Sequence, residues 1–107
     1  MACLIDTHNH MQSEQFDHDR PDVFRRAKES GVGCALIAAG ISGDWTKCLR
    51  VGAESGWCVG LGVHPLAPAR PTVTPEVADE LRDALRREMA DPASRVVAVA
   101  EIGLDGF

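Results

Sequence analysis

Four continuously apolar runs divide the chain. They are ACLID at residues 2–6, GCALIA at 33–38, WCVGLGV at 57–63 and RVVAVAEIG at 95–103. Apolar and polar residues do not alternate within these runs, a pattern typical of strands that are buried on both faces of a parallel sheet covered by helices. We therefore predict four parallel strands at these positions.

Three segments between the runs have the spacing of amphipathic helices. The first covers residues 19–31, with Pro21 in its opening turn and Gly31 where a C-cap is expected. The second covers residues 42–56. The third begins with Thr74 as N-cap and Pro75 at the first helical position, and it ends at residues 91–92. Its apolar residues recur at every fourth position: Val77, Leu81, Leu85 and Met89.

The order of these elements is strand, helix, strand, helix, strand, helix, strand. Three successive strand–helix–strand units predict an α/β fold with a right-handed parallel sheet. A chain of 107 residues is long enough for one domain with one modest core. Residues 66–74, LAPARPTVT, are expected to form a proline-rich loop before the third helix.

Composition and charge narrow the function classes. The chain is 45% hydrophobic and 25% charged, as expected of a folded globular protein. Its net charge of −5 gives no overall attraction for a polyanion, so contact with nucleic acid would need a local basic patch. Arg20, Arg25 and Arg26 form one early cluster, which we interpret as a solvated helix face.

The four cysteines and the N-terminus bear on the cellular compartment. Cys3, Cys34, Cys48 and Cys58 show no C-x-x-C spacing, so we expect reduced residues of the core. No apolar stretch approaches the ~20 residues of a membrane span, and the N-terminus lacks the pattern of a signal peptide. A cytoplasmic protein without membrane contact is expected.

Polar residues that can bind a metal or transfer a proton follow three of the four strands. The first strand is followed by His8 and His10, the third by His64, and the fourth by Glu101 and then Asp105. In α/β sheets and barrels, ligands bind at the carboxyl ends of the strands. We therefore expect these side chains to meet at one edge of the sheet.

His8 and His10 are two residues apart in an extended segment, so both project to one side, and Asp6 shares that side. Two imidazoles with a carboxylate suit a divalent metal. Taken alone, the histidine pair is more often a chance surface feature, His64 a hydrogen-bonded loop residue, and Glu101 half of a salt bridge. Burying Glu101 without a partner would be costly, however, and a metal is a good partner for a carboxylate.

Four motifs, considered together, are more specific. They are D-T-H-N-H at residues 6–10, F-D-H-D-R at 16–20, G-V-H-P at 62–65 and E-I-G-L-D at 101–105. With these motifs the chain resembles the N-terminal portion of the TatD-like metal-dependent hydrolases, a (β/α)₈ barrel family of the amidohydrolase group. The resemblance covers essentially the whole chain. It departs from the family pattern at Asn9, Ala100 and Gly106, and none of these departures removes a ligand.

The resemblance implies site residues, a cofactor and a substrate. His8, His10 and Glu101 would bind the metal, and Glu101 could bridge two ions. Glu101 and His64 would be catalytic, His64 lying near the substrate, while Asp6 and Asp105 would support the ligands. The cofactor would be one or two divalent ions of zinc, manganese or magnesium, and the activity would be hydrolysis of DNA or another phosphodiester through a metal-activated water.

Length is the main departure from the family. A complete barrel needs ~250 residues and eight strands, so residues 1–107 are expected to form a partial TatD-like domain, half of a barrel that stops after the fourth strand. The family's later ligands would lie beyond Phe107, and any activity would be reduced. Such a half barrel has two unpaired edges, which predicts a homodimer that closes the barrel, or aggregation.

Two alternatives stay open at this point. The chain could be a non-catalytic α/β fragment that acts as a binding or assembly module or has no function. It could also be a small doubly wound nucleotide-binding domain, although no G-x-G-x-x-G pattern follows the first strand.

Overall fold

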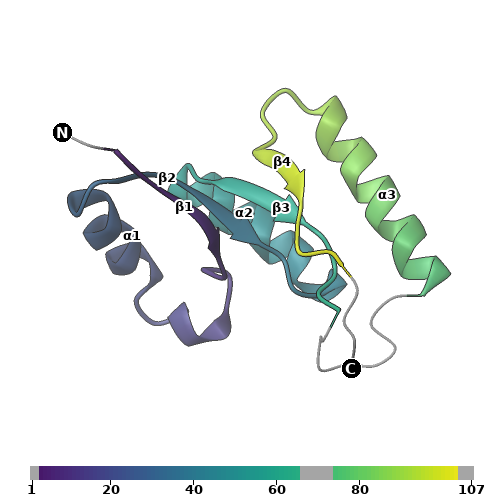
Figure 1. Cartoon of the computed structure of the whole chain (residues 1–107), viewed down its shortest axis with the longest axis horizontal. Helices are drawn as coiled ribbons and strands as arrows, with labels where there is room; N and C mark the ends of the chain where they lie inside the picture. Colours follow the sequence, from purple (N-terminus) through teal and green to yellow (C-terminus); the bar gives the residue numbers. More distant parts are fainter. Residues whose placement is uncertain (1–2, 66–73, 104–107) are drawn as a thin grey trace.

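The computed structural model describes residues 3–65 and 74–103. Within them, four parallel strands form one sheet in the order β1-β2-β3-β4 (Figure 1). The strands are β1 (Leu4–Asn9), β2 (Val32–Ala38), β3 (Cys58–Leu61) and β4 (Val96–Val99). The predicted order of strands and helices and the parallel pairing are confirmed.

Helices connect the strands at the predicted places. They are α1 (Arg20–Glu29), α2 (Trp45–Ser55) and α3 (Pro75–Ala90), with short 3₁₀ turns η1 (Glu14–Phe16) and η2 (Ser42–Asp44). Gly56 ends α2 with a φ of 78°, a left-handed conformation that glycine adopts without strain. The Thr74 hydroxyl caps α3 by accepting a hydrogen bond from the Val77 amide at 3.2 Å.

The core lies between the sheet and the helices. Its largest fully buried side chains come from both layers: Ile37, Leu61, Val51, Val59 and Cys48. Phe24 of α1 packs edge-to-face on Trp57, with ring centroids 4.7 Å apart. This single cluster fixes the strands to the helices and thereby sets where the strand ends lie.

The opposite face of the sheet is open among the described residues. On β4, Val97 and Val99 are 65% and 43% exposed, whereas Val96 packs against the core. Strands in sequential order with connections of one hand place all helices on one face. The prediction that every strand is buried on both faces is therefore wrong for β4 and for β1, where Leu4 and Ile5 are exposed.

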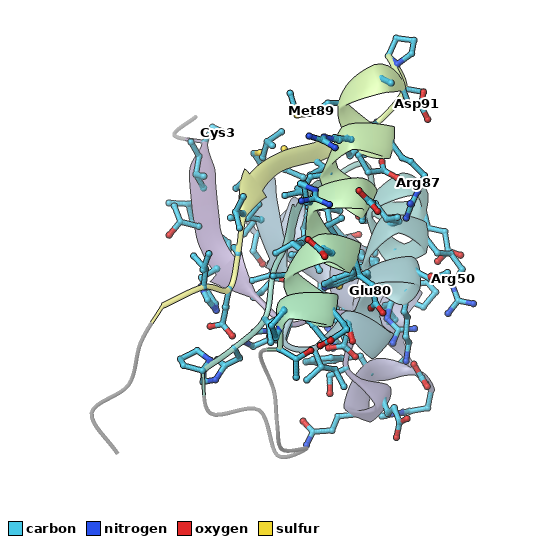
Figure 2. The ribbon with its side chains drawn as sticks, turned by 90° about the vertical axis from the view of Figure 1, so that its right-hand side faces the viewer. Cys3, Arg50, Glu80, Arg87, Met89 and Asp91 are labelled. Carbon is cyan, nitrogen blue, oxygen red and sulfur yellow. The ribbon has the colours of Figure 1, made fainter. Side chains whose placement is uncertain are left out.

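Two apolar residues of the predicted core lie at the surface (Figure 2). Met89 was placed on the buried stripe of α3, but it is 85% exposed, while Val77, Leu81 and Leu85 pack against the core as predicted. Cys3 is exposed because it precedes an edge strand. The four cysteines are free, and burial raises the pKa of the Cys48 thiol to about 12.

Arg20 corrects the interpretation of the basic cluster. Its side chain is buried and bonds backbone carbonyls, whereas Arg25 and Arg26 are exposed and pair with Asp22. The solvated helix face is therefore confirmed for Arg25 and Arg26 and wrong for Arg20. Among residues 3–65 and 74–103, no helix is long and apolar enough to cross a membrane.

Candidate metal centre

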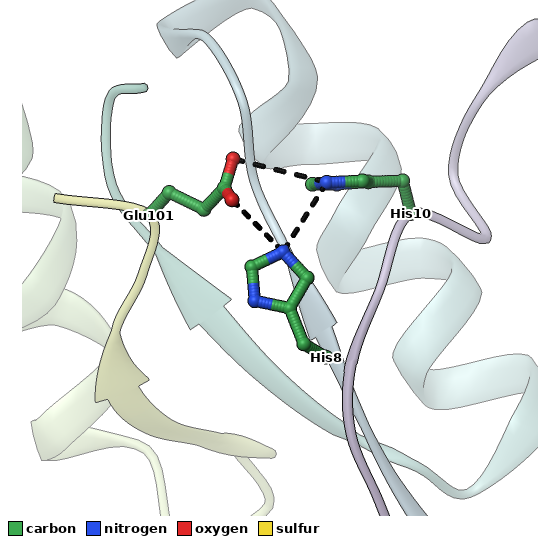
Figure 3. A group of neighbouring side chains, drawn as sticks. All are labelled: His8, His10 and Glu101. Atoms are coloured by element: carbon green, nitrogen blue, oxygen red, sulfur yellow. Dashed lines mark hydrogen bonds and ion pairs between the residues drawn. The ribbon is translucent and has the colours of Figure 1, made fainter. Parts of the chain in front are cut away.

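Three side chains from the two edge strands meet at the carboxyl end of the sheet (Figure 3). His8 Nε2 lies 2.8 Å from Glu101 Oε1 and 3.3 Å from His10 Nε2. His10 Nε2 lies 3.8 Å from Glu101 Oε2. The three residues can each direct one donor atom so that all three atoms are within 4.8 Å of one another. The predicted convergence of His8, His10 and Glu101 is thus present in the fold.

His8 is the last residue but one of β1, and its backbone is held by Asp6. Asp6 Oδ1 accepts a hydrogen bond from the His8 amide at 3.1 Å, and Oδ2 accepts one from the Asn9 side chain at 3.0 Å. Asn9 Oδ1 in turn accepts from the Met11 amide. Asp6 therefore orders the turn that carries both histidines through backbone and amide groups, and within the described residues its hydrogen bonds go to no imidazole ring.

His10 follows β1 and has a fixed ring orientation. Its Nδ1 lies 2.9 Å from the carbonyl oxygen of Ala38, the last residue of β2. A carbonyl oxygen only accepts hydrogen bonds, so the bonded neutral ring carries its proton on Nδ1. The Nε2 lone pair is then directed toward His8 and Glu101, as metal coordination requires.

Glu101 is placed by close packing of backbone. The Ala100 amide donates to the Leu61 carbonyl at 3.0 Å, and the Glu101 amide donates to the Ala39 carbonyl at 2.8 Å. A Cβ at Gly62 would lie 2.1 Å from the Glu101 carbonyl oxygen, so glycine is required there. The glycine of G-V-H-P, a motif noted for its histidine, is what lets this segment approach β3.

The Glu101 carboxylate has capacity for a cation. Its side chain is 18% exposed, and its Oε2 atom is buried without a hydrogen-bond partner among the described residues. Ligand atoms of a tetrahedral zinc site, at about 2.0–2.1 Å from the ion, are separated by about 3.3 Å. His8 Nε2 lies 2.8 Å from Glu101 Oε1 and 3.3 Å from His10 Nε2, separations close to that value, so the three residues fit a divalent metal.

His64 lies beside these groups, as the sequence predicted. Its amide donates to the Gly40 carbonyl at 2.8 Å, which fixes the segment after β3, and its Nε2 is 3.6 Å from Glu101 Oε2. His8, His64 and Glu101 line a cavity of about 340 Å³ together with the apolar residues Val99 and Ile102. The cavity opens beside His8 and Glu101, where a substrate group could reach them.

The predicted supporting roles of Asp6 and Asp105 stay predictions. Asp6 has the contacts described above, and Asp105 lies outside the described residues. Sequence reasoning missed the hydrogen bonds that Asn9, Gln12 and Arg20 make in and around the segment after β1. Arg20 ends the F-D-H-D-R motif, which marks it as a candidate, but sequence alone does not reveal that its side chain bonds the carbonyls of Met11 and Ser13.

Comparison with known proteins gives matches to one family. The family model described as TatD-related DNase matches residues 5–107. The chain is 30% identical to the human deoxyribonuclease TATDN3 over 104 residues, and 33% identical to the 3′-5′ ssDNA/RNA exonuclease TatD of Pantoea vagans over 104 residues. Each alignment covers 95% of this chain, and 38% and 37% of the two relatives.

A solved structure shares the fold. The crystal structure of YjjV, a TatD homologue from Escherichia coli, superposes with a TM-score of 0.80 at 33% identity, over 97% of this chain and 38% of that chain. The metal-dependent hydrolase YjjV is 34% identical to this chain over 110 residues, which are 40% of its length. The chain therefore spans about two fifths of the curated relatives that it matches.

Proposed function

The chain belongs to the family of TatD-related DNases, and from that premise we propose that His8, His10 and Glu101 bind a divalent metal ion as part of a phosphodiester hydrolase centre. The observation that carries the proposal is the meeting of three donor atoms within 4.8 Å of one another, beside a buried carboxylate oxygen without a hydrogen-bond partner in the described part of the chain. A buried carboxylate oxygen without a partner is costly, and a cation would remove that cost.

The donor set favours some metals over others. Two imidazoles and one carboxylate suit zinc or manganese better than magnesium, which prefers oxygen ligands and keeps several waters. A metal bound here would supply an activated water and polarise a phosphoryl oxygen. The name of the relative YjjV, a metal-dependent hydrolase, supports metal use.

Glu101 and His64 would supply the proton acceptor and a hydrogen-bond donor to the substrate. A Glu101 oxygen that does not bind the metal would be free to accept a proton from a nucleophilic water, since Glu101 lines the cavity. His64 lines the same cavity as His8 and Glu101 and would donate a hydrogen bond to a phosphoryl oxygen of the substrate. We propose DNA or a related phosphodiester as the substrate, because the relatives include a deoxyribonuclease and an ssDNA/RNA exonuclease.

We also propose how this chain relates to a complete domain and to a second copy of itself. Residues 1–107 are proposed to be part of a TatD-type domain, since the matched relatives are more than twice as long. Edge strands β1 and β4 and the exposed Val97 and Val99 support a homodimer that covers the open face of the sheet. The cytoplasmic location stays a prediction.

Calorimetric titration of Zn²⁺ or Mn²⁺ tests the metal site. The chain should bind at least one ion, and His8→Ala combined with His10→Ala should weaken binding at least 100-fold, because two of three protein ligands are lost. His18→Ala is the matched control, since the His18 side chain is 78% exposed and lies outside the cluster. Equal affinities for all three proteins would refute the site.

Hydrolysis is tested separately with a labelled single-stranded oligonucleotide and the metal-loaded protein. Metal-dependent cleavage that is lost in Glu101→Gln supports the hydrolase proposal. Metal binding without any cleavage would leave the metal site in place and contradict the catalytic part of the proposal.

A further inference from the structure

The Ala38 carbonyl at the end of β2 accepts two side-chain hydrogen bonds. One comes from His10 Nδ1 at 2.9 Å, and the other comes from Gln12 Nε2 at 2.9 Å. A carbonyl oxygen has two lone pairs, so both bonds can form together. His10 and Gln12 therefore share one acceptor, and both hydrogen bonds depend on where the Ala38 carbonyl oxygen lies.

Gln12 is unusual among the polar residues of the segment after β1. It is buried, with 4% of its surface exposed, whereas Ser13, Glu14 and Gln15 are half-buried or exposed. Burying an amide costs free energy unless it is hydrogen-bonded, and its Oε1 atom has no partner among the described residues. The bond from Nε2 to Ala38 is thus the polar contact that holds the side chain in this place.

Arg20 fixes the backbone on which Gln12 is carried. Its Nε donates to the Met11 carbonyl at 2.7 Å, and its Nη2 donates to the Ser13 carbonyl at 3.0 Å and to the Asp17 carboxylate. Charge-assisted hydrogen bonds of this kind are stronger than neutral ones. The residues on either side of Gln12 are therefore anchored to the first turn of α1.

We propose that Gln12 is a positioning residue for His10. By donating to the same Ala38 carbonyl as the imidazole, Gln12 keeps that oxygen where it accepts the Nδ1 proton of His10. This fixes the ring in the tautomer whose Nε2 lone pair is directed at Glu101 and His8. The benefit of this tautomer for metal binding rests on the proposed function. The tautomer itself is a property of the metal-free protein and can be measured without a metal.

NMR of the metal-free protein with ¹⁵N-labelled histidine reads the tautomer through long-range proton–nitrogen correlations. In the wild type, His10 should carry its proton on Nδ1. Gln12→Met, which keeps the length of the side chain and removes the donor, should give a mixture of tautomers at His10. Gln15→Met is the matched control, since Gln15 is exposed, and should leave His10 unchanged.

Zinc affinity, measured by competition with a fluorescent chelator, gives the second reading. Gln12→Met should weaken zinc binding about tenfold, as loss of a group that orients a ligand does, and Gln15→Met should not change it. If Gln12→Met does not fold, as judged by circular dichroism, Gln12→Asn replaces it, because its shorter amide withdraws the donor from Ala38.

The outcomes separate this inference from the metal site. A wild type that binds neither zinc nor manganese would refute the proposed function, and the tautomer comparison would still decide the role of Gln12. Wild-type tautomer and wild-type zinc affinity in the Gln12 variant would overturn the inference while leaving the metal site in place. A wild-type His10 protonated on Nε2 would overturn it as well.

Discussion

The two sides of the candidate metal centre are held by different means. The His10 side, residues 10–20, relies on side chains, because Gln12 and Arg20 bond carbonyls of the segment and of β2. The Glu101 side, residues 100–103, relies on backbone, because the Ala100 and Glu101 amides bond β3 and the residue after β2. Only glycine at position 62 leaves room for that approach.

This difference shows where each side is sensitive. A backbone that packs directly on backbone has no flexible group that can move aside, so a single added methyl group must displace the main chain. A segment held by several side-chain hydrogen bonds loses its anchors one at a time. The Glu101 side should therefore respond to a change of shape, and the His10 side to a change of donors.

Gly62→Ala is expected to have the largest effect. The new Cβ would lie 2.1 Å from the Glu101 carbonyl oxygen and 2.6 Å from the Ala100 carbonyl carbon. We expect a loss of about 3 kcal/mol or more in the free energy of unfolding, measured by urea denaturation. Gly43→Ala is the control, since among the described residues its Cβ would meet only Ile41 Cδ1 within 4 Å, at an ordinary 3.7 Å. Equal stability of the two variants would show that the backbone approach is not tight.

Arg20→Met should have an intermediate effect. The variant keeps the aliphatic stem and removes the donors to Met11, Ser13 and Asp17, so the free energy of unfolding should fall by about 2 kcal/mol. Arg26→Met, which removes one exposed pair with Asp22, should cost less than about 0.5 kcal/mol. Amide NMR shifts should change in residues 10–13 and stay constant in residues 100–103. Amide shift changes of equal size in residues 10–13 and 100–103 would contradict the claim that the two sides of the site are held independently.

Asp17 should give the smallest effect, and one that depends on pH. Hydrogen bonds from Lys47 and Arg20 lower its pKa from 3.8 to about 2. Because the folded pKa is depressed, the contribution of Asp17 to stability is fully present above pH 4 and is lost as the pH falls toward 2. The ¹³C shift of the carboxyl carbon should titrate near pH 2 in the wild type and near 4 in Arg20→Met combined with Lys47→Met. A wild-type titration near pH 4 would mean that these partners do not hold the carboxylate.

Much of the fold follows from the sequence, because local signals and the global topology agree. The apolar runs and the caps at Gly56 and Thr74 depend on neighbouring residues, so the elements could be placed. Burial of individual residues depends on which elements lie alongside. Three apolar residues of predicted elements are exposed: Val97 lies on the open face of the sheet, Leu4 lies at the start of edge strand β1, and Met89 lies near the end of α3.

The candidate site also has features that the sequence predicts and features that it does not. The convergence of His8, His10 and Glu101 could be predicted because the carboxyl ends of parallel strands meet at one edge. The roles of Gln12 and Arg20 could not, because a polar side chain in a loop is buried only when tertiary contacts bring carbonyls to it. Gly62 appeared in a motif, but the reason for a glycine there became visible only with the Glu101 backbone beside it.

X-ray absorption spectroscopy of the zinc-loaded chain tests most directly whether His8, His10 and Glu101 bind one ion. The spectrum should show two imidazole nitrogens at about 2.0–2.1 Å and at least one carboxylate oxygen at about 2.0–2.2 Å. The imidazole signature should disappear in the His8→Ala, His10→Ala variant and persist in His18→Ala. A wild-type zinc shell without imidazole, or one unchanged in the double variant, would contradict the account.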